Sequence, residues 1–219
     1  MKLANTIVLA VVLSLCLTAS IASADMMTFT GTVLTESVKF HCQGLLADGL
    51  TVHAGLYGIN YQNRAFNAYC VDADQYAGTG AMTERDVDVL RNGSYVAYLY
   101  ERYIGSATTA RQAAALGVAI WEVLYENNGT VFNASSGKFY ITNNSDVAAA
   151  ANVMLTGMLT GMPANYQPVM DLTVLQSASK QDMLIGGLNN AVPEPATVAM
   201  LLLGAPLMLK ASRRRKLAA

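Results

Sequence analysis

The chain has 219 residues, a formal net charge of −1 and 53% apolar residues, but only three cysteines and two histidines. This length is sufficient for one domain with a hydrophobic core. The dispersed histidines and cysteines argue against a transition-metal site, and no basic stripe with interleaved aromatic residues is present. We therefore expect no nucleic-acid partner, no metal and no cofactor.

The N-terminus carries an export signal. Met1-Lys2 is a short basic start, residues 7–17 are apolar, and Ala22-Ser23-Ala24 has the small-x-small pattern of a cleavage site. We expect signal peptidase to remove residues 1–24 and to cut between Ala24 and Asp25. Lipidation at Cys16 is the alternative, and it is disfavoured by the bulky residue that precedes this cysteine.

The exported part differs in charge from the precursor. Residues 25–195 contain 8 basic and 15 acidic side chains, a net charge of −7. Such a charge favours solubility and opposes binding to nucleic acid or anionic lipid. The acidic residues near 72–88 lack the spacing of a calcium loop and are interpreted as a solvated face. We expect one domain over residues 25–187, followed by a linker and sorting segment over 188–219.

The first half of this domain has the composition of β-strands. Thr, Val and aromatic residues are enriched, and glycines punctuate the pattern. The predicted strands are residues 27–34, 37–42, 50–57 and 65–71. They indicate an antiparallel β-sheet or a small barrel.

A helical block is expected next. Thr83 with the acidic residues after it resembles a helix start, Gly93 a helix end, and residues 95–104 a second helix. Residues 108–126 form the strongest helix pattern and are apolar on nearly every side, which predicts a buried helix. Gly117 lies inside it, where glycine costs roughly 1 kcal/mol relative to alanine.

The composition of the last third of the domain predicts mainly strands again. Residues 131–132 and 138–141 suggest a hairpin, 145–159 a helix, and 171–175 and 182–185 two short strands. Strands, a helical block and strands again indicate an α+β fold, with the helices inserted into the antiparallel sheet.

The C-terminal tail has three parts in a fixed order. The motif Val192-Pro193-Glu194-Pro195 precedes an apolar run, residues 196–209, and the basic cluster Arg213-Arg214-Arg215-Lys216 follows. The run predicts a short C-terminal apolar helix. Its 14 residues fall below the roughly 20 of a stable membrane span, and Pro206 disturbs it. We therefore expect transient insertion into the inner membrane.

This tail closely resembles the PEP-CTERM sorting signal of Gram-negative bacteria, which an exosortase recognises. The resemblance implies that the basic cluster stays in the cytoplasm while the Pro-Glu-Pro motif is processed outside the membrane. It also implies a final location at the cell surface or outside the cell. An ordinary tail anchor is the alternative.

Two segments suggest the ancestry of the domain. In residues 66–72, Cys70 follows Tyr69 and precedes Val71; in residues 116–126, Trp121 follows Ala119-Ile120. Together they resemble the thioester domains of bacterial surface proteins, especially those with PEP-CTERM tails. In that family the cysteine is joined to a glutamine four residues before the tryptophan, and a surface nucleophile opens the thioester to make a covalent attachment.

The present chain departs from this pattern at one position. Four residues before Trp121 is Gly117, which has no carboxamide. Gln112 lies five residues earlier, about 7.5 Å along the helix and turned by roughly 140°. The resemblance therefore implies a thioester-type scaffold whose chemistry is lost, with Gly117 facing Cys70 and the space of the missing side chain filled by a neighbour or by water.

Three interpretations of Cys70 remain at this stage. It is a buried small apolar side chain, or it forms a disulfide with Cys42, which would be worth roughly 3 to 4 kcal/mol. A catalytic thiol paired with His41 or His53 is the third, and no orienting group at a recognisable spacing supports it.

We therefore expect a non-enzymatic surface or extracellular-matrix protein with a structural or adhesive role. Its expected processing partners are signal peptidase and an exosortase, and the location offers exopolysaccharide or other surface components as further partners. An active covalent thioester adhesin and a secreted cysteine hydrolase are the alternatives.

Overall fold

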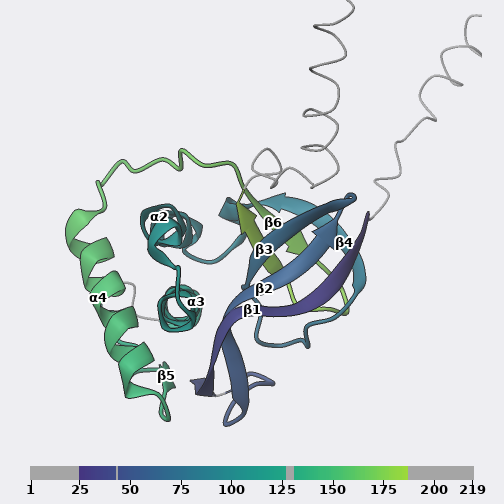
Figure 1. The fold of residues 1–219 in the computed structure, drawn as a ribbon. Helices are drawn as coiled ribbons and strands as arrows, with labels where there is room; N and C mark the ends of the chain where they lie inside the picture. The colour runs from purple at the N-terminus through teal and green to yellow at the C-terminus, as the bar shows by residue number, and fades with distance from the viewer. Residues whose placement is uncertain (1–24, 43, 127–130, 187–219) are drawn as a thin grey trace, which may run out of the picture.

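A computed structural model describes residues 25–42, 44–126 and 131–186 (Figure 1). Seven strands and three α-helices are found in these residues, which confirms the α+β class. The elements in chain order are β1 Asp25–Cys42, β2 Thr51–Tyr61, β3 Arg64–Cys70, β4 Gly80–Asp86, α2 Gly93–Tyr103, α3 Ala110–Tyr125, β5 Phe139–Ile141, α4 Ser145–Gly161, β6 Leu172–Gln176 and β7 Met183–Gly186. Short 3₁₀ turns, Val87–Val89 and Ile104–Ser106, flank α2.

The strands form a closed barrel, one of the two arrangements that the sequence left open. The order of neighbours is β2-β3-β7-β6-β4-β1, and β1 also pairs with β2, so six antiparallel strands close on themselves. Closure gives each of these six strands a partner strand on both sides. The short β5 lies outside the ring and pairs only with the end of β1.

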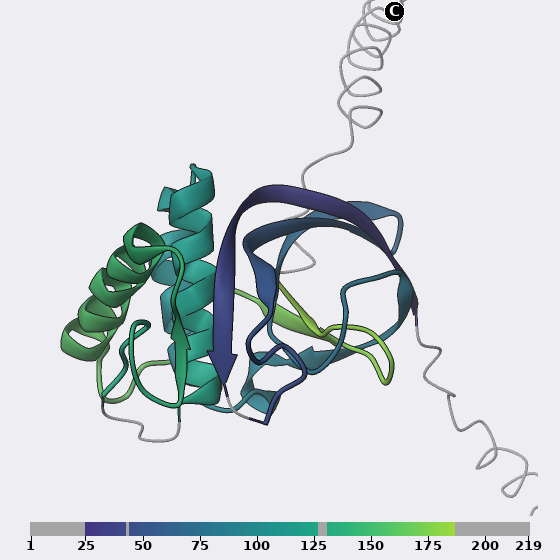
Figure 2. The ribbon, with the colours of Figure 1, turned by 90° about the horizontal axis from the view of Figure 1, so that it is seen from below.

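Strand β1 is long enough to connect the barrel with the helical side of the molecule. Residues 25–27 pair with β4, residues 27–39 with β2, and residues 40–42 with β5. Two register shifts, one beside Gly31 at φ +122°, interrupt its pairing with β2. Because such irregularities bend a strand, β1 can arch around the barrel and then run beside α3 (Figure 2).

Helix α3 packs against β1 and β2 of the barrel on one side and against α2 and α4 on the others (Figure 1). A capping box starts it, in which Thr109 and Gln112 exchange side-chain and backbone hydrogen bonds. Every residue from 113 to 124 is buried. The prediction of a buried helix over residues 108–126 is therefore confirmed.

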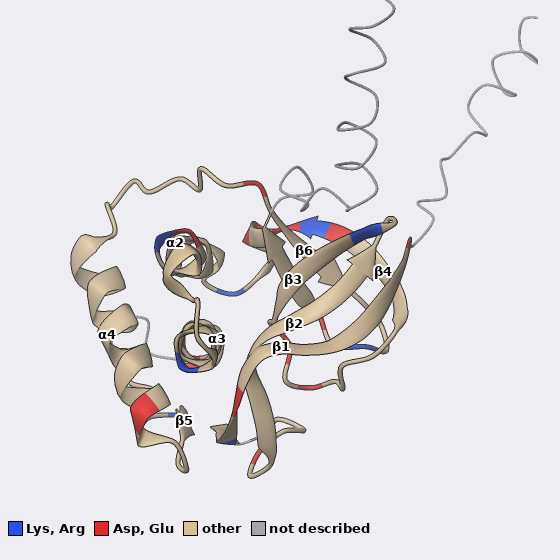
Figure 3. Cartoon of the chain, in the orientation of Figure 1, with Lys and Arg blue, Asp and Glu red and all other residues tan. Residues whose placement is uncertain are grey.

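Charged side chains are sparse on the outer helix. Figure 3 shows α4 almost without Lys, Arg, Asp or Glu, and Asp146 is its single charged residue. This carboxylate lies 3.1 Å from the guanidinium of Arg111 on α3. In the part of the chain that the structure describes, no helix is both long and apolar enough to cross a membrane.

Two local predictions were wrong. The helix expected to start at Thr83 is strand β4, because residues 83–86 pair with β6 and residues 80–82 with β1. Local capping signals are weaker than this tertiary pairing. Gly93 begins helix α2 rather than ending a helix. The position requires glycine because a side chain there would collide with the carbonyl of Val87.

The hairpin expected within residues 131–141 is also wrong. Residues 139–141 form β5, whose partner is β1: Phe40 pairs with Ile141 and Cys42 with Phe139. Strand β4 pairs only with residues 25–27 of β1, so the edge of β1 that faces away from β2 is open to β5 at residues 40–42. The helix predicted over 145–159 and the strands over 171–175 and 182–185 are confirmed, with boundaries shifted by one or two residues.

Candidate functional site

Cys70 and Trp121 meet in the structure. Cys70 is the last residue of β3, and Trp121 lies on the face of α3 that packs toward the barrel. The indole Nε1–H of Trp121 donates a hydrogen bond to the main-chain carbonyl of Cys70 at 2.9 Å. Because both groups are buried, this bond ties the helix to the end of β3.

The space that a side chain at residue 117 would occupy is filled by neighbouring residues, one of the two outcomes expected from the sequence. The space beside Gly117 is filled by Gly55 of β2 and by the ring of Tyr69: a Cβ at residue 117 would lie 3.1 Å from the Gly55 nitrogen and 3.5 Å from Tyr69 Cδ1. Gly55 itself has φ +129°, and a side chain there would collide with the Leu34 carbonyl. Gly117 therefore lets α3 approach the Gly55 backbone of β2 closely, whereas Gly55 is required by its own backbone conformation and by β1.

The Cys70 thiol is placed to be inert. The side chain is buried, and its S–H donates to the carbonyl of Asp72 at 3.1 Å. Burial raises the pKa of this thiol to about 12, so the nucleophilic thiolate is almost absent at neutral pH. Burial also raises the pKa of the Cys42 thiol.

Cys42 and Cys70 do not form a disulfide in the structure, where both are free thiols. The strand register shows why. Tyr69, next to Cys70, pairs with Leu56, which pairs with Leu34, eight residues before Cys42 on β1. Cys42 has left the barrel by that point and pairs with β5.

His41 and His53 do not supply a partner for the Cys70 thiol either. His41 stacks on Tyr140, and its Nδ1 lies 3.6 Å from an oxygen of Asp48. His53 is exposed on β2. Of the glutamines, Gln112 is used in the capping box of α3.

Gln181 is the residue near Cys70 that sequence reasoning missed. It precedes β7, and its Nε2 donates to the same Asp72 carbonyl as the Cys70 thiol, at 2.7 Å. Both groups act as donors to one oxygen, so the Asp72 carbonyl holds the thiol proton in place. No spacing motif could have found Gln181, because β7 reaches this position only through its pairing with β3.

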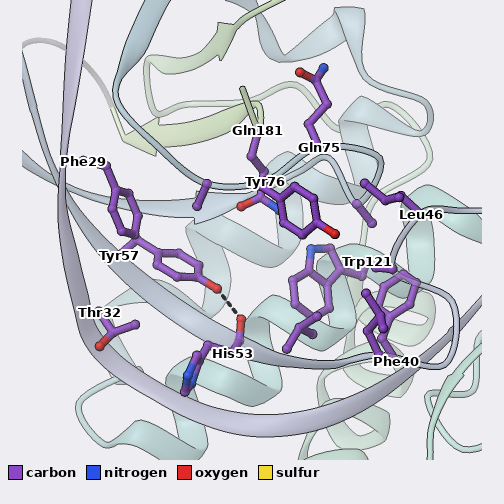
Figure 4. A pocket seen from close by; sticks show the side chains of 15 residues that line it. Phe29, Thr32, Phe40, Leu46, His53, Tyr57, Gln75, Tyr76, Trp121 and Gln181 are labelled. Carbon is purple, nitrogen blue, oxygen red and sulfur yellow. Dashed lines mark hydrogen bonds between the residues drawn. The ribbon is translucent and has the colours of Figure 1, made fainter. Parts of the chain in front are cut away.

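A cavity of about 360 Å³ lies on the other side of Trp121 (Figure 4). Its walls come from β1, β2, α3, the loops over residues 44–50 and 71–79, and Gln181. Phe29 and Tyr57 lie on one side and Phe40 and Trp121 on the other. Nothing in the sequence marked this site, because its walls are assembled from segments far apart in the chain.

The remaining predicted site residues fall outside the described part of the chain. These are the cleavage residue Ala24, the sorting motif Val192, Pro193, Glu194 and Pro195, the basic cluster Arg213, Arg214, Arg215 and Lys216, and the C-terminal apolar helix. Asp25 is described and is the first residue of β1.

Comparisons with known proteins return two solved structures from Streptococcus pyogenes. One is the N-terminal thioester domain of fibronectin-binding protein SfbI, with 12% identity, a TM-score of 0.43, and 77% of this chain and 95% of that chain covered. The other is the N-terminal domain of the pilus tip adhesin Cpa, with 13% identity, a TM-score of 0.45, and 80% and 97% covered. No family model and no curated protein matches. At these values the similarity carries no functional conclusion.

Proposed function

We propose that this chain is an exported surface or extracellular-matrix protein of a Gram-negative bacterium, with a structural or adhesive and non-enzymatic role. Its signal peptide would be removed between Ala24 and Asp25, and an exosortase would process it at the Pro-Glu-Pro motif after transient insertion into the inner membrane. The three-part tail supports the sorting step. Exopolysaccharide or other surface components are the partners that this location offers.

The state of Cys70 is the observation that carries the non-covalent role. The thiol is buried and protonated, its hydrogen is used by the Asp72 carbonyl, and a side chain at residue 117 would press on the backbone of β2. A covalent adhesin needs an activated acyl group, and a cysteine hydrolase needs an accessible thiolate with a base. The described residues around Cys70 supply neither.

Intact mass of the exported protein tests this role. We expect the mass of the processed sequence, without the loss of about 17 Da that a thioester would cause or the loss of about 2 Da of a disulfide, and we expect methylamine to leave it unchanged. Both cysteines should react with iodoacetamide only after unfolding, because the thiolate is the reactive form. A mass deficit of about 17 Da that methylamine reverses would show that a thioester forms after all.

The sorting step has its own test. Replacing Pro193 and Pro195 with Ala should leave the precursor in the inner membrane, whereas the same change at Pro163 and Pro168, outside the motif, should not affect release. Normal trimming of the Pro193→Ala and Pro195→Ala protein would show that the motif is not the recognition element. Detection of the Arg213–Lys216 peptide in released protein would refute processing altogether.

A further inference from the structure

The cavity beside Trp121 extends from the surface into the core of the domain. At its outer end Tyr76 is 68% exposed and Leu46 51% exposed, while at its inner end Phe40 and Trp121 are buried. Its volume of about 360 Å³ falls within the range of pockets that take small ligands. A ligand could therefore enter beside Tyr76 and reach the indole ring.

Aromatic rings form two facing walls of this cavity. Phe29 and Tyr57 have ring centroids 5.7 Å apart on one side, and Phe40 meets Trp121 edge to face at 5.6 Å on the other (Figure 4). The Tyr57 hydroxyl is already bound, since it donates to the carbonyl of His53. Its ring, rather than its polar end, is thus what it offers to a ligand, and the site favours a flat apolar body.

The lining is also uncharged. None of the described residues that form it is Asp, Glu, Lys or Arg. Transfer of an ion into such surroundings has no compensating charge and is strongly unfavourable. The ligand should therefore be neutral.

Gln181 supplies one oriented polar group. Because its Nε2 donates to the Asp72 carbonyl at 2.7 Å, the amide cannot rotate freely, and Oε1 is left as an acceptor at the cavity. Figure 4 shows this side chain reaching toward the space between Tyr57 and Tyr76. A ligand that carries a hydrogen-bond donor beside its apolar body would match it.

We propose that this cavity is a binding site for a neutral small molecule with a flat, ring-shaped apolar body and one hydrogen-bond donor. The apolar body lies between the two aromatic walls, and the donor points to Oε1 of Gln181. This binding function goes beyond the sorting and the surface role proposed above, and neither of them depends on it.

The neutral dye phenylnaphthylamine is a suitable probe, because it has two flat apolar parts and one N–H. Trp121 is the only tryptophan of the chain, so energy transfer from its indole to the dye reports binding at this site. We expect saturable transfer with a stoichiometry of one. Anilinonaphthalene sulfonate, which has the same skeleton with an added anionic group, should bind at least about 10-fold more weakly.

Two variants block the cavity without touching its buried walls. Leu46→Arg and Ala77→Arg place a charge at the entrance from different loops, and each should weaken dye binding at least about 10-fold. Val153→Arg is the matched control, because Val153 is 71% exposed on α4 and does not line the cavity; it should change affinity less than about 2-fold. Unchanged affinity in both blocking variants would place the dye elsewhere and overturn the proposal, as would the absence of saturable transfer.

The role of Gln181 is tested by changing both partners of the hydrogen bond. Gln181→Met should weaken phenylnaphthylamine about 3- to 10-fold, since a neutral hydrogen bond is lost. In phenoxynaphthalene an oxygen replaces the N–H. Its dissociation constant, measured by competition with the dye, should be the same for the wild type and for this variant. Equal weakening of both compounds would refute the acceptor role, and equal affinity of the sulfonate and the neutral dye would refute the class of ligand.

Discussion

The two sides of Trp121 differ in almost every physical respect. On the Nε1 side lies a closed junction, defined by Cys70, Gly117 and Gly55, in which the Trp121 N–H and the Cys70 S–H both have acceptors and the helix contacts the sheet backbone. On the ring side lies an open cavity with aromatic walls and an exposed tyrosine at its entrance. One residue of a motif can thus stabilise the fold through its polar group and line a binding site with its ring. Resemblance to the motif alone does not show which of these two contacts serves the function.

The largest expected effect comes from removing the residue that both sides share. Trp121→Ala should lower the free energy of unfolding by about 3 to 5 kcal/mol, because it empties a buried volume and leaves the Cys70 carbonyl without its donor. Urea denaturation followed by circular dichroism measures this. Trp121→Phe keeps most of the volume and should cost less; equal costs would mean that the hydrogen bond dominates over packing.

The next effect concerns the junction alone. Gly117→Gln should lower the free energy of unfolding by roughly 2 kcal/mol, since its Cβ would press on the Gly55 backbone, and no thioester should form. Intact mass and thermal unfolding check both parts. Gly105→Ala is the control, because an added Cβ there meets open space. If Gly117→Gln were as stable as the control, the close approach of α3 to β2 would be wrong.

A buried carboxyl group on α3, that of Glu122, should make the stability of the protein depend on pH. Glu122 is fully buried, one oxygen accepts from the Asn133 N–H at 2.7 Å, and burial, with a smaller contribution from Glu126, raises its pKa to about 7. A raised pKa means that the native state holds the proton longer than the unfolded chain, so stability should fall as pH rises from about 4.5 to 7. The expected loss is on the order of 2 kcal/mol.

Glu122→Gln is the matched variant for this prediction, because it keeps the acceptor oxygen and cannot ionise. Its free energy of unfolding should exceed that of the wild type at pH 8 and approach it at pH 5. Parallel pH profiles of the two proteins would show that Glu122 is not the group responsible.

The smallest effect is expected at Cys70. Cys70→Ala removes one buried atom and a weak hydrogen bond, so it should cost about 1 kcal/mol and leave dye binding in the cavity unchanged. A loss of stability with unchanged dye affinity would show that the junction and the cavity are independent of each other. A loss of dye affinity equal to that of Leu46→Arg would show that the two sides of Trp121 are coupled.

The contacts that the sequence predicted correctly are those encoded within single segments. The buried helix over 108–126 follows from its uninterrupted apolar composition, and its N-terminal cap is complete within four residues. The contact between Cys70 and Trp121 joins two segments that are far apart in the chain, and the resemblance named both segments without predicting this contact. The short strands over 171–175 and 182–185 were found from composition.

The predictions that were wrong concern residues whose contact partners lie far away in the chain. The glycine at 117 is explained by Gly55, sixty-two residues earlier, because a side chain at residue 117 would press on the Gly55 backbone. Thr83 carries helix-start signals, yet β6, about ninety residues later, holds it in a strand. The cavity could not be predicted at all, since no segment contains more than a part of its wall.

The order of strands around the barrel has a consequence for how the protein is made. The ring closes only through β6 and β7, which lie at residues 172–186, because they connect β3 with β4. A chain that emerges from a ribosome or a translocation pore N-terminus first therefore exposes the unpaired edges of β3 and β4 until nearly the whole domain is out. Such distant pairings slow folding, so we expect folding after translocation and a need for protection of the emerging strands.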